Sequence, residues 1–180
     1  QSIFNQYLTT IKDSSDMVLN SLHQASTLIT SFKDIAIDQL HEKKQTLNIK
    51  HTLENVLLIL LPSLDKHDHK VTIKCNDELQ IESFASSLMQ VFTHLISNSL
   101  LHGFEGTEGG EITIDISDIG DNHILIKYHD NGEGIPDKNQ DKIFDPFFTT
   151  KRNQGGAGLG LHVIYNIISQ SMEGSISVDS

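Results

Sequence analysis

The sequence predicts an α+β fold, in which an α/β sandwich with helices on one face of a mixed sheet follows a helical segment. Two observations lead to this prediction. Apolar residues recur at helical spacing in residues 1–46, which contain no glycine or proline. From about Gln45 onward, short runs typical of strands alternate with longer helical runs. We therefore divide the chain into a helical segment, residues 1–46, and a mixed domain, residues 47–180.

The helical segment contains a heptad pattern. Its apolar residues recur in steps of four and three: Val18, Leu22, Ala25, Ile29, Phe32 and Ala36. The same steps occur upstream at Phe4, Leu8 and Ile11, and the polar residues 13–16 between the two runs are candidate helix caps at a break. The narrow apolar seam favours a helical hairpin that dimerises into a bundle. A helix that packs on its own domain is the alternative.

The mixed domain is predicted to alternate between helices and strands. The expected helices cover residues 53–64, closing at Pro62; residues 83–102, capped by Ser83; and residues 159–172. The expected strands cover residues 69–75, 79–82, 111–117 and 122–129, with a turn at 119–121 and a further strand starting over 174–178. The run 111–117 alternates most clearly, with Ile112, Ile114 and Ile116 on one face.

Composition excludes several functions. The net charge is −11, so nucleic-acid binding is disfavoured and bound phosphates would need a divalent cation. The single cysteine, Cys75, fits a reducing, cytoplasmic setting. The longest apolar run, residues 56–61, is too short to cross a bilayer, so we expect no membrane contact by this part. Because the chain opens with Gln1 and no signal peptide is visible, we expect a piece of a longer protein, whose missing part could hold a membrane anchor.

The helix over residues 83–102 carries polar residues on its apolar side. The stripe consists of Phe84, Leu88, Val91 and Leu95 and continues into Asn98 and His102. His94 lies one turn before Asn98. A core-side amide needs partners, because leaving it unpaired costs about 1–3 kcal/mol. Asn98 is therefore either a satisfied structural residue or an oxygen ligand for a hard cation such as Mg²⁺.

A glycine-containing turn follows the strand that ends near His129. Asp130 leads this turn, and Gly132 and Gly134 give it a flexible backbone. The pattern fits a simple tight turn. It also fits a carboxylate that accepts a hydrogen bond from an adenine amino group, with the glycines letting a flat base approach the backbone.

An aromatic and glycine-rich stretch comes next. Phe144, Phe147 and Phe148 precede the basic pair Lys151 and Arg152 and the glycines of residues 155–160. No Lys-Ser/Thr pair follows these glycines, so they do not form a P-loop, and no strand precedes them as in a dinucleotide fingerprint. A linker would explain the glycines but not the aromatic residues. We expect a mobile loop that ends at a helix N-terminus, where free N–H groups favour phosphate.

In this order and spacing, the pieces resemble the motifs of sensor histidine kinases. Residues 90–99 are similar to the N box, 130–135 to the first glycine box, 144–148 to the F box and 156–161 to the second glycine box. The resemblance covers roughly residues 47–180 and, more loosely, the helical segment. It implies the Bergerat-type ATP-binding fold of the gyrase, chaperone, histidine kinase and mismatch-repair ATPases.

The resemblance also implies roles for individual residues. Asn98 would coordinate Mg²⁺, Asp130 would bind adenine, residues 144–158 would form the ATP lid, and Lys151 would contact phosphate. The other expected ATP contacts are His102, Gly132, Gly134, Ile135, Phe144, Phe148, Thr149, Gly156, Gly158, Leu159, Gly160 and Leu161.

Two departures from the family pattern affect the site. His94 stands where the family has a second Asn and hydrolytic relatives tend to have a Glu, which argues for phosphotransfer over hydrolysis. We expect Asn98 and His94 to be the catalytic candidates, with His94 either at metal-bound water or phosphate or a packed polar substitute. Leu101 replaces a common basic residue, which leaves His102 and Lys151 to contribute charge.

The phosphoacceptor motif of the family is missing. It requires a His followed by Glu or Asp and shortly by Pro, and no proline precedes Pro62. His41-Glu42 matches only the dipeptide, and His23 precedes Gln24. We therefore expect the acceptor upstream of Gln1, residues 18–39 as the second hairpin helix, and a truncated last strand.

The predicted function is the catalytic region of a protein histidine kinase. It would bind ATP with Mg²⁺ and donate the γ-phosphate to a histidine outside this chain, for relay to the aspartate of a response-regulator receiver domain. The full-length protein would be a homodimer through the helical segment. Two alternatives remain open: a protein serine kinase of the same fold, and a non-catalytic nucleotide-sensing dimerisation module.

Overall fold

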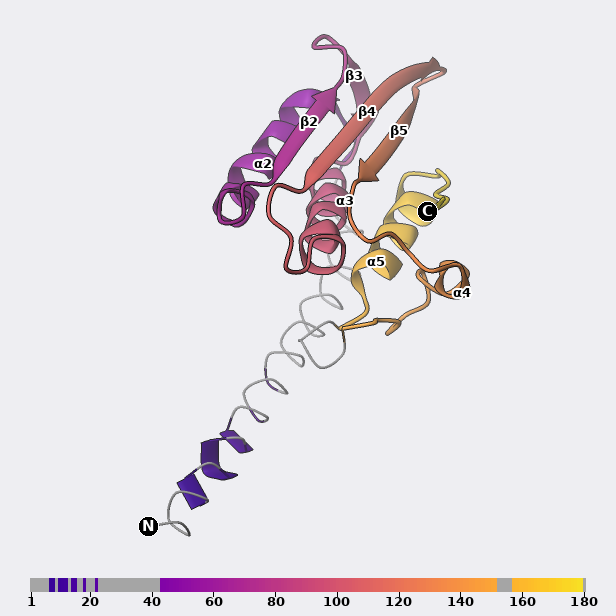
Figure 1. Ribbon diagram of the computed structural model, residues 1–180. Coiled ribbons are helices and arrows are strands. Elements are labelled where there is room, and N and C mark those ends of the chain that lie inside the picture. Colours follow the sequence, from indigo (N-terminus) through magenta and orange to yellow (C-terminus); the bar gives the residue numbers. More distant parts are fainter. Residues whose placement is uncertain are drawn as a thin grey trace.

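The structure, a computed structural model, describes residues 43–151 and 157–179, together with residues 7, 8, 10–12, 14, 15, 18 and 22. The mixed domain is a two-layer α/β sandwich, with a layer of helices on one side of a twisted sheet (Figure 1). This arrangement confirms the predicted fold class.

The main sheet has three strands in the order β2-β4-β5. β2 (Lys70–Lys74) pairs parallel with β4 (Glu111–Gly120), and β4 pairs antiparallel with β5 (His123–Asp130). The predicted alternation in β4 is confirmed, because Ile112, Ile114 and Ile116 are at most 5% exposed. A separate antiparallel pair joins β1 (Gln45–Asn48) to β3 (Gln80–Ser83). The sequence did not predict β1, since its four residues become a strand only by pairing with β3.

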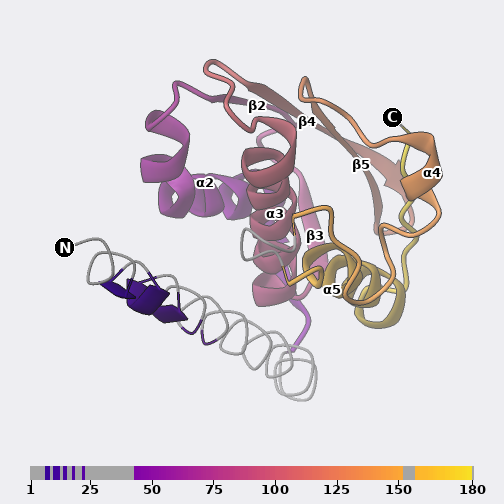
Figure 2. The same ribbon diagram turned by 60° about the horizontal axis from the view of Figure 1, so that its bottom comes forward.

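The helices form one layer against the sheet, as the views in Figures 1 and 2 agree. They are α2 (Ile49–Asp65), α3 (Ala85–Asn98) and α5 (Gly160–Asn166), with a short α4 (Asp137–Gln140) outside the layer. α3 continues into the π-helical turn η2 (Ser99–Gly103), and α5 continues into η4 (Ile167–Ser171).

α3 is buried on two sides, which positions the residues that follow it. Leu88, Phe92 and Ile96 belong to the cluster between α2 and the sheet, whereas Val91 packs against Val163 of α5. Both Phe92 and Ile96 are fully buried. Because each side of the helix has an apolar neighbour, its carboxyl-terminal turn is held rigidly where the sheet and α5 meet.

Three predicted boundaries are wrong. Pro62 lies inside α2 and does not end it. A proline removes the hydrogen bond to the carbonyl four residues earlier, and that residue, Leu58, is 68% exposed, so water can satisfy the carbonyl. Ser83 belongs to β3 and is buried, and the N-cap position of α3 is Phe84 with no side-chain cap. The β4–β5 turn centres on Asp121 and Asn122, both with positive φ, and not on residues 119–121.

The expected strand over residues 174–178 is also wrong. The structure assigns no strand to residues 172–179, and β5 pairs only with β4 among the described residues. A strand is defined by its ladder of hydrogen bonds to a neighbour, so an extended segment without such a ladder is not counted as one.

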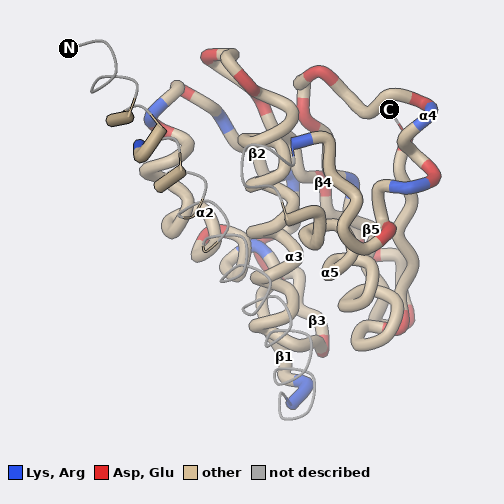
Figure 3. Tube along the Cα trace, turned by 90° about the horizontal axis from the view of Figure 1, so that it is seen from below, with Lys and Arg blue, Asp and Glu red and all other residues tan. Residues whose placement is uncertain are grey.

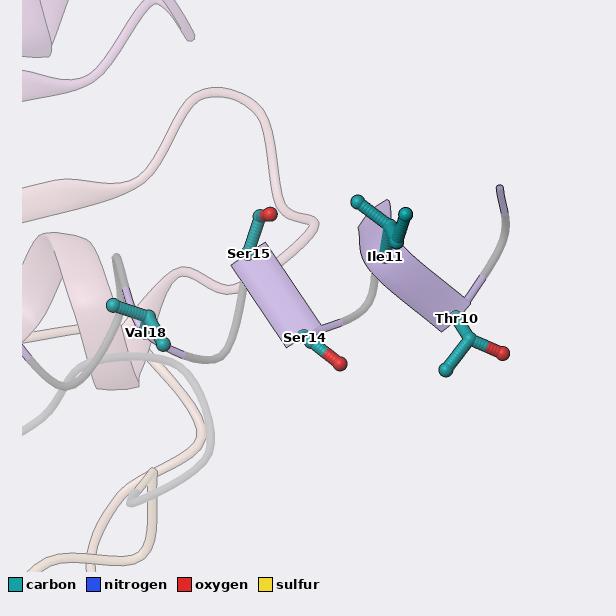
Figure 4. A pocket seen from close by; sticks show the side chains of 5 residues that line it. All are labelled: Thr10, Ile11, Ser14, Ser15 and Val18. Carbon is teal, nitrogen blue, oxygen red and sulfur yellow. The ribbon is translucent and has the colours of Figure 1, made fainter. Parts of the chain in front are cut away.

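The described residues between positions 7 and 22 are all helical. The predicted boundary between residues 46 and 47 is wrong, because it falls inside β1, and Gln45 and Thr46 are strand residues that pair with β3. The expected break at residues 13–16 is wrong for Ser14 and Ser15, which are helical and exposed. Ser15 continues the steps of four and three between Ile11 and Val18, which places it on the same helix face as these apolar residues. Figure 4 shows that these residues, with Thr10, line a shallow hollow. Residues 23–42, with His23, His41 and most of the predicted seam, lie outside the described residues.

Within the part of the chain that is described, no helix is both long enough and apolar enough to cross a membrane.

Candidate functional site

A cavity of about 1670 Å³ lies between the carboxyl-terminal end of α3, the turn after β5, the segment around Phe148 and the start of α5. It is larger than a typical ligand pocket of about 300–1,000 Å³. A second part of it extends along β5 and residues 172–179. The cavity is lined by every residue expected to bind nucleotide, metal or substrate except Gly156, which lies outside the described residues.

Asn98 is the last residue of α3 and faces the start of α5. Its Nδ2 is buried and has no hydrogen-bond partner among the residues that the structure describes. A β-carbon at Gly160 would lie 3.5 Å from Asn98 Oδ1 and 3.6 Å from His94 Nδ1. The side chains of Asn98 and His94 therefore converge on the same glycine. A buried amide nitrogen without a partner is unusual, and it indicates a ligand-binding position.

Asp130 is the last residue of β5, and its carboxylate is held from two sides. Ser99 Oγ donates to Asp130 Oδ2 over 2.5 Å, and the backbone N–H of Gly132 donates to Oδ1 over 3.0 Å. The Tyr128 hydroxyl lies 2.7 Å from Ser99 Oγ. Ser99 and Tyr128 were not predicted as site residues. The available signals were the position of Ser99 directly after Asn98 and that of Tyr128 on the same strand face as Asp130.

The turn after Asp130 is fixed to the neighbouring elements. Asn131 Oδ1 accepts the backbone N–H of Glu111 over 2.8 Å, which ties the turn to the start of β4. A β-carbon at Gly132 would lie 2.6 Å from the Cα and O atoms of Gly103, so Gly132 lets two backbones meet. The close contact with Gly103 therefore requires a glycine at position 132, independently of the expected approach of a base. Gly134 has a φ of 70°, which a glycine adopts without strain.

The segment around Phe144 and Phe148 packs against α5. His162 Nδ1 donates to the carbonyl of Phe144 over 2.9 Å, and the Phe144 ring lies 5.7 Å from that of Tyr165. Gly158 has a φ of 69°, and a β-carbon there would lie 2.6 Å from the Phe148 carbonyl oxygen. The F-box-like residues and the second glycine-rich run, which are apart in sequence, are therefore in direct backbone contact.

Lys151 forms an ion pair with Glu105, a residue that the sequence analysis missed. Lys151 is 14% exposed, so most of its side chain is covered. Close by, Thr150 Oγ1 lies 3.5 Å from His102 Nδ1. Burial, and then the charge of Lys151, lowers the pKa of His102. This lowered pKa favours the neutral form of His102.

The cavity is acidic. Two lysines, Lys44 and Lys151, line it together with seven acidic residues: Glu82, Glu105, Asp121, Asp130, Glu133, Glu173 and Asp179. Figure 3 shows acidic positions spread over the coloured part of the trace, which has no long basic stretch. No group of three His, Cys, Asp or Glu side chains among the described residues is placed to hold a metal ion by itself. A metal in this cavity would therefore need ligand atoms from a bound molecule as well as from Asn98.

A family model for the histidine kinase-, DNA gyrase B-, and HSP90-like ATPases matches residues 84–180. This range covers more than half of the chain and contains Asn98, Asp130 and the glycine-rich stretch. The chain belongs to this ATPase family. The resemblance to sensor histidine kinases that the motifs indicated is thereby confirmed.

The chain is also similar, in sequence and in structure, to individual kinases of this family. The ATPase-family chain is 30% identical to Sporulation kinase B of Bacillus subtilis (strain 168) over 184 residues, which cover 100% of this chain and 41% of that protein. The catalytic domain of histidine kinase ThkA superposes with a TM-score of 0.63 at 27% identity, over 72% of this chain and 82% of that chain. Histidine kinase ThkA in complex with response regulator protein TrrA matches with a TM-score of 0.65 at 25% identity, over 90% of this chain and 45% of that chain. This chain thus spans less than half the length of the curated relative and of the ThkA chain in that complex.

Proposed function

We propose that this ATPase-family chain is the ATP-binding catalytic region of a protein histidine kinase, which donates the γ-phosphate of Mg–ATP to a histidine outside the chain. The observation that carries this proposal is the buried Nδ2 of Asn98, a hydrogen-bond donor that has no partner among the described residues and lies beside Gly160. The names of the relatives support the kinase activity: Sporulation kinase B and histidine kinase ThkA.

The residues of the site fit a nucleotide with its metal. Asn98 can offer an amide oxygen to Mg²⁺, a hard cation that prefers oxygen ligands. When bound, Mg²⁺ would offset the negative charge of the phosphates in this acidic cavity. At the other end, the Asp130 carboxylate would accept a hydrogen bond from the adenine amino group. Lys151 would exchange its contact with Glu105 for a contact with phosphate.

The chain would act mainly by orientation and charge neutralisation, as in other phosphoryl transfers. Asn98 and Lys151 would hold the phosphates so that an incoming imidazole could attack in line. His94 takes the place of the acidic base found in hydrolytic relatives, and its Nδ1 lies on the same side as the Asn98 amide. With no carboxylate at this position to activate water, transfer is favoured over hydrolysis.

The proposal extends to partners and to the helical segment. We infer that the helical segment before β1 forms part of a dimerisation hairpin and that the catalytic domain begins with β1, because Gln45 and Thr46 pair with β3. The exposed apolar residues Leu8, Ile11, Val18 and Leu22, which share one heptad seam, support the hairpin. The ThkA structure was solved with a response regulator protein, which supports a receiver domain as the final phosphoryl acceptor here.

Substitution of Asn98 tests the binding site. We expect Asn98→Ala to abolish Mg²⁺-dependent ATP binding while the domain remains folded, because only one amide is lost. Isothermal titration calorimetry with and without Mg²⁺ measures the effect, and thermal melting checks the fold. Asn55→Ala is the matched control, since Asn55 lies on α2 outside the cavity. Unchanged Mg–ATP affinity in Asn98→Ala would refute this site.

A transfer assay tests the reaction. Labelled ATP is incubated with this chain and a separate domain that carries a His-Glu…Pro acceptor helix. We expect an acid-labile, base-stable phosphorylated product, which is typical of phosphohistidine. An acid-stable product would identify a serine kinase instead. Binding of ATP without transfer to any acceptor would contradict the kinase proposal and favour a nucleotide-sensing module.

A further inference from the structure

Asp130 is one end of a chain of three hydrogen-bonded side chains. Ser99 Oγ lies between Asp130 Oδ2, at 2.5 Å, and the hydroxyl of Tyr128, at 2.7 Å. Tyr128 and Asp130 are alternate residues of β5 and so share one face of the sheet. Ser99 opens η2, directly after Asn98, and is 3% exposed. Bulk water therefore has little access to the centre of the chain.

The hydrogen bonds in this chain run in one direction. An ionised carboxylate can only accept, so the Ser99 hydroxyl donates to Asp130. Since its one hydrogen is then used, Ser99 Oγ must accept from the Tyr128 hydroxyl. Burial, reinforced by the charge of Asp130, raises the pKa of Tyr128, although its bond to Ser99 acts in the opposite sense. The Tyr128 hydroxyl therefore stays protonated and able to donate at neutral pH.

The arrangement leaves part of the carboxylate available. Asp130 Oδ1 accepts the Gly132 N–H over 3.0 Å, and each carboxylate oxygen can accept two hydrogen bonds. A β-carbon at Gly103 would lie 3.3 Å from Asp130 Oδ1. Because Gly103 has no side chain, the space next to this carboxylate oxygen stays open. Asp130 is thus held at both oxygens and still lines the cavity with unused acceptor capacity.

We propose that Ser99 and Tyr128 are positioning residues that determine the base selectivity of the site. By holding Asp130 in one orientation as an acceptor, they favour a purine that carries an amino group at its 6-position. A purine with a hydrogen there offers no donor to Asp130, and one with a carbonyl oxygen places a second acceptor against it. This inference rests on the proposed function, in which Asp130 binds the adenine amino group.

The test combines protein variants with two nucleotides. Calorimetry measures the Kd of ATP and of purine riboside triphosphate, which has a hydrogen in place of the 6-amino group, with Mg²⁺ present. We expect Tyr128→Phe to weaken ATP binding about fivefold and to change the binding of the analogue less than twofold. Ser99→Ala should reduce the preference for ATP further, because Asp130 then loses its direct partner. Tyr165→Phe is the matched control, since Tyr165 lies on α5 outside the cavity, and it should change neither affinity.

The possible outcomes distinguish the role of Asp130 from the roles of Ser99 and Tyr128. If wild-type protein binds both nucleotides equally, Asp130 does not bind the amino group, and that part of the proposed function fails together with the inference. If the wild type prefers ATP and both variants weaken the two nucleotides by the same factor, Ser99 and Tyr128 are only structural and the inference alone is overturned. Thermal melting of each variant shows that affinities are compared between folded proteins.

Discussion

Replacement of Gly160 by alanine is expected to stabilise the protein and weaken Mg–ATP binding at the same time. The added β-carbon would lie 3.5 Å from Asn98 Oδ1 and 3.6 Å from His94 Nδ1, which are ordinary contact distances. The folded protein therefore accepts it without a clash. Alanine restricts the unfolded chain, which contributes about 0.4–1 kcal/mol to stability. For a chain of this size, we expect the melting temperature to rise by about 1–4 °C.

The same methyl group competes with the ligands that we place beside Asn98. An Mg²⁺ ion binds an amide oxygen at about 2.1 Å, and its other oxygen ligands then lie about 3 Å from that oxygen. These ligands would need the space that the methyl group fills at 3.5 Å from Oδ1. We expect the Kd of Mg–ATP to rise at least tenfold, which corresponds to about 1.4 kcal/mol.

Gly109→Ala is the matched control for this prediction. Gly109 lies outside the cavity and has a φ of 71°, and its β-carbon would meet no atom within 4 Å. The substitution should therefore cost about 1 kcal/mol of stability through backbone strain and leave binding unchanged. Thermal melting should show a higher melting temperature for Gly160→Ala and a lower one for Gly109→Ala. Calorimetry should show weaker Mg–ATP binding for Gly160→Ala only. Wild-type Mg–ATP affinity in Gly160→Ala, or a lower melting temperature, would refute the reasoning.

Three further predictions follow from other contacts. Glu105→Gln should tighten Mg–ATP binding severalfold in calorimetry, because the charge that competes for Lys151 is removed. Burial lowers the pKa of His69 from its usual 6.5, so the unfolded chain takes up the proton first and the free energy of unfolding falls as the pH drops below about 6.5. His69→Asn keeps an acceptor for the Gly110 N–H, and should flatten this decrease in denaturant titrations between pH 7 and 5. Phe92→Ala should cost about 3–5 kcal/mol of unfolding free energy, because Phe92 is fully buried.

Each of these variants has a control within the chain. Glu108→Gln removes an exposed charge outside the cavity, and equal tightening there would mean that Lys151 is not involved. His129→Asn changes an exposed histidine of β5, and a pH profile flattened equally by both substitutions would contradict the role of burial. Phe147 is 49% exposed, so Phe147→Ala should cost much less than Phe92→Ala, and similar losses would contradict the assigned core.

Local patterns predicted most of the fold. The alternation of Ile112, Ile114 and Ile116 identified β4, because the two-residue period of a strand is a property of consecutive residues. Features that depend on distant partners were missed. β1 exists through its pairing with β3, which begins 35 residues after β1 does. The sequence predicts a helix end at Pro62, although the exposure of the preceding turn lets the helix continue.

The residues of the candidate site can also be predicted from local sequence patterns, but their partners cannot. Four motifs in order indicate Asn98, Asp130 and the glycine-rich stretch, because residue type and spacing are visible in the sequence. The neighbours that hold these residues were not visible. Ser99 meets Asp130 across 31 positions and Tyr128 across 29, and Lys151 meets Glu105 from another element.

Residue types and their spacing are sufficient to identify the ATPase family and the kinds of side chain in the nucleotide site. Which atoms meet follows from the three-dimensional packing: the Asn98 amide lies beside Gly160, Ser99 holds the Asp130 carboxylate, and Glu105 holds the Lys151 ammonium. The physical reason is that a hydrogen bond or an ion pair acts over about 3–4 Å, whereas the residues it joins can lie anywhere along the chain.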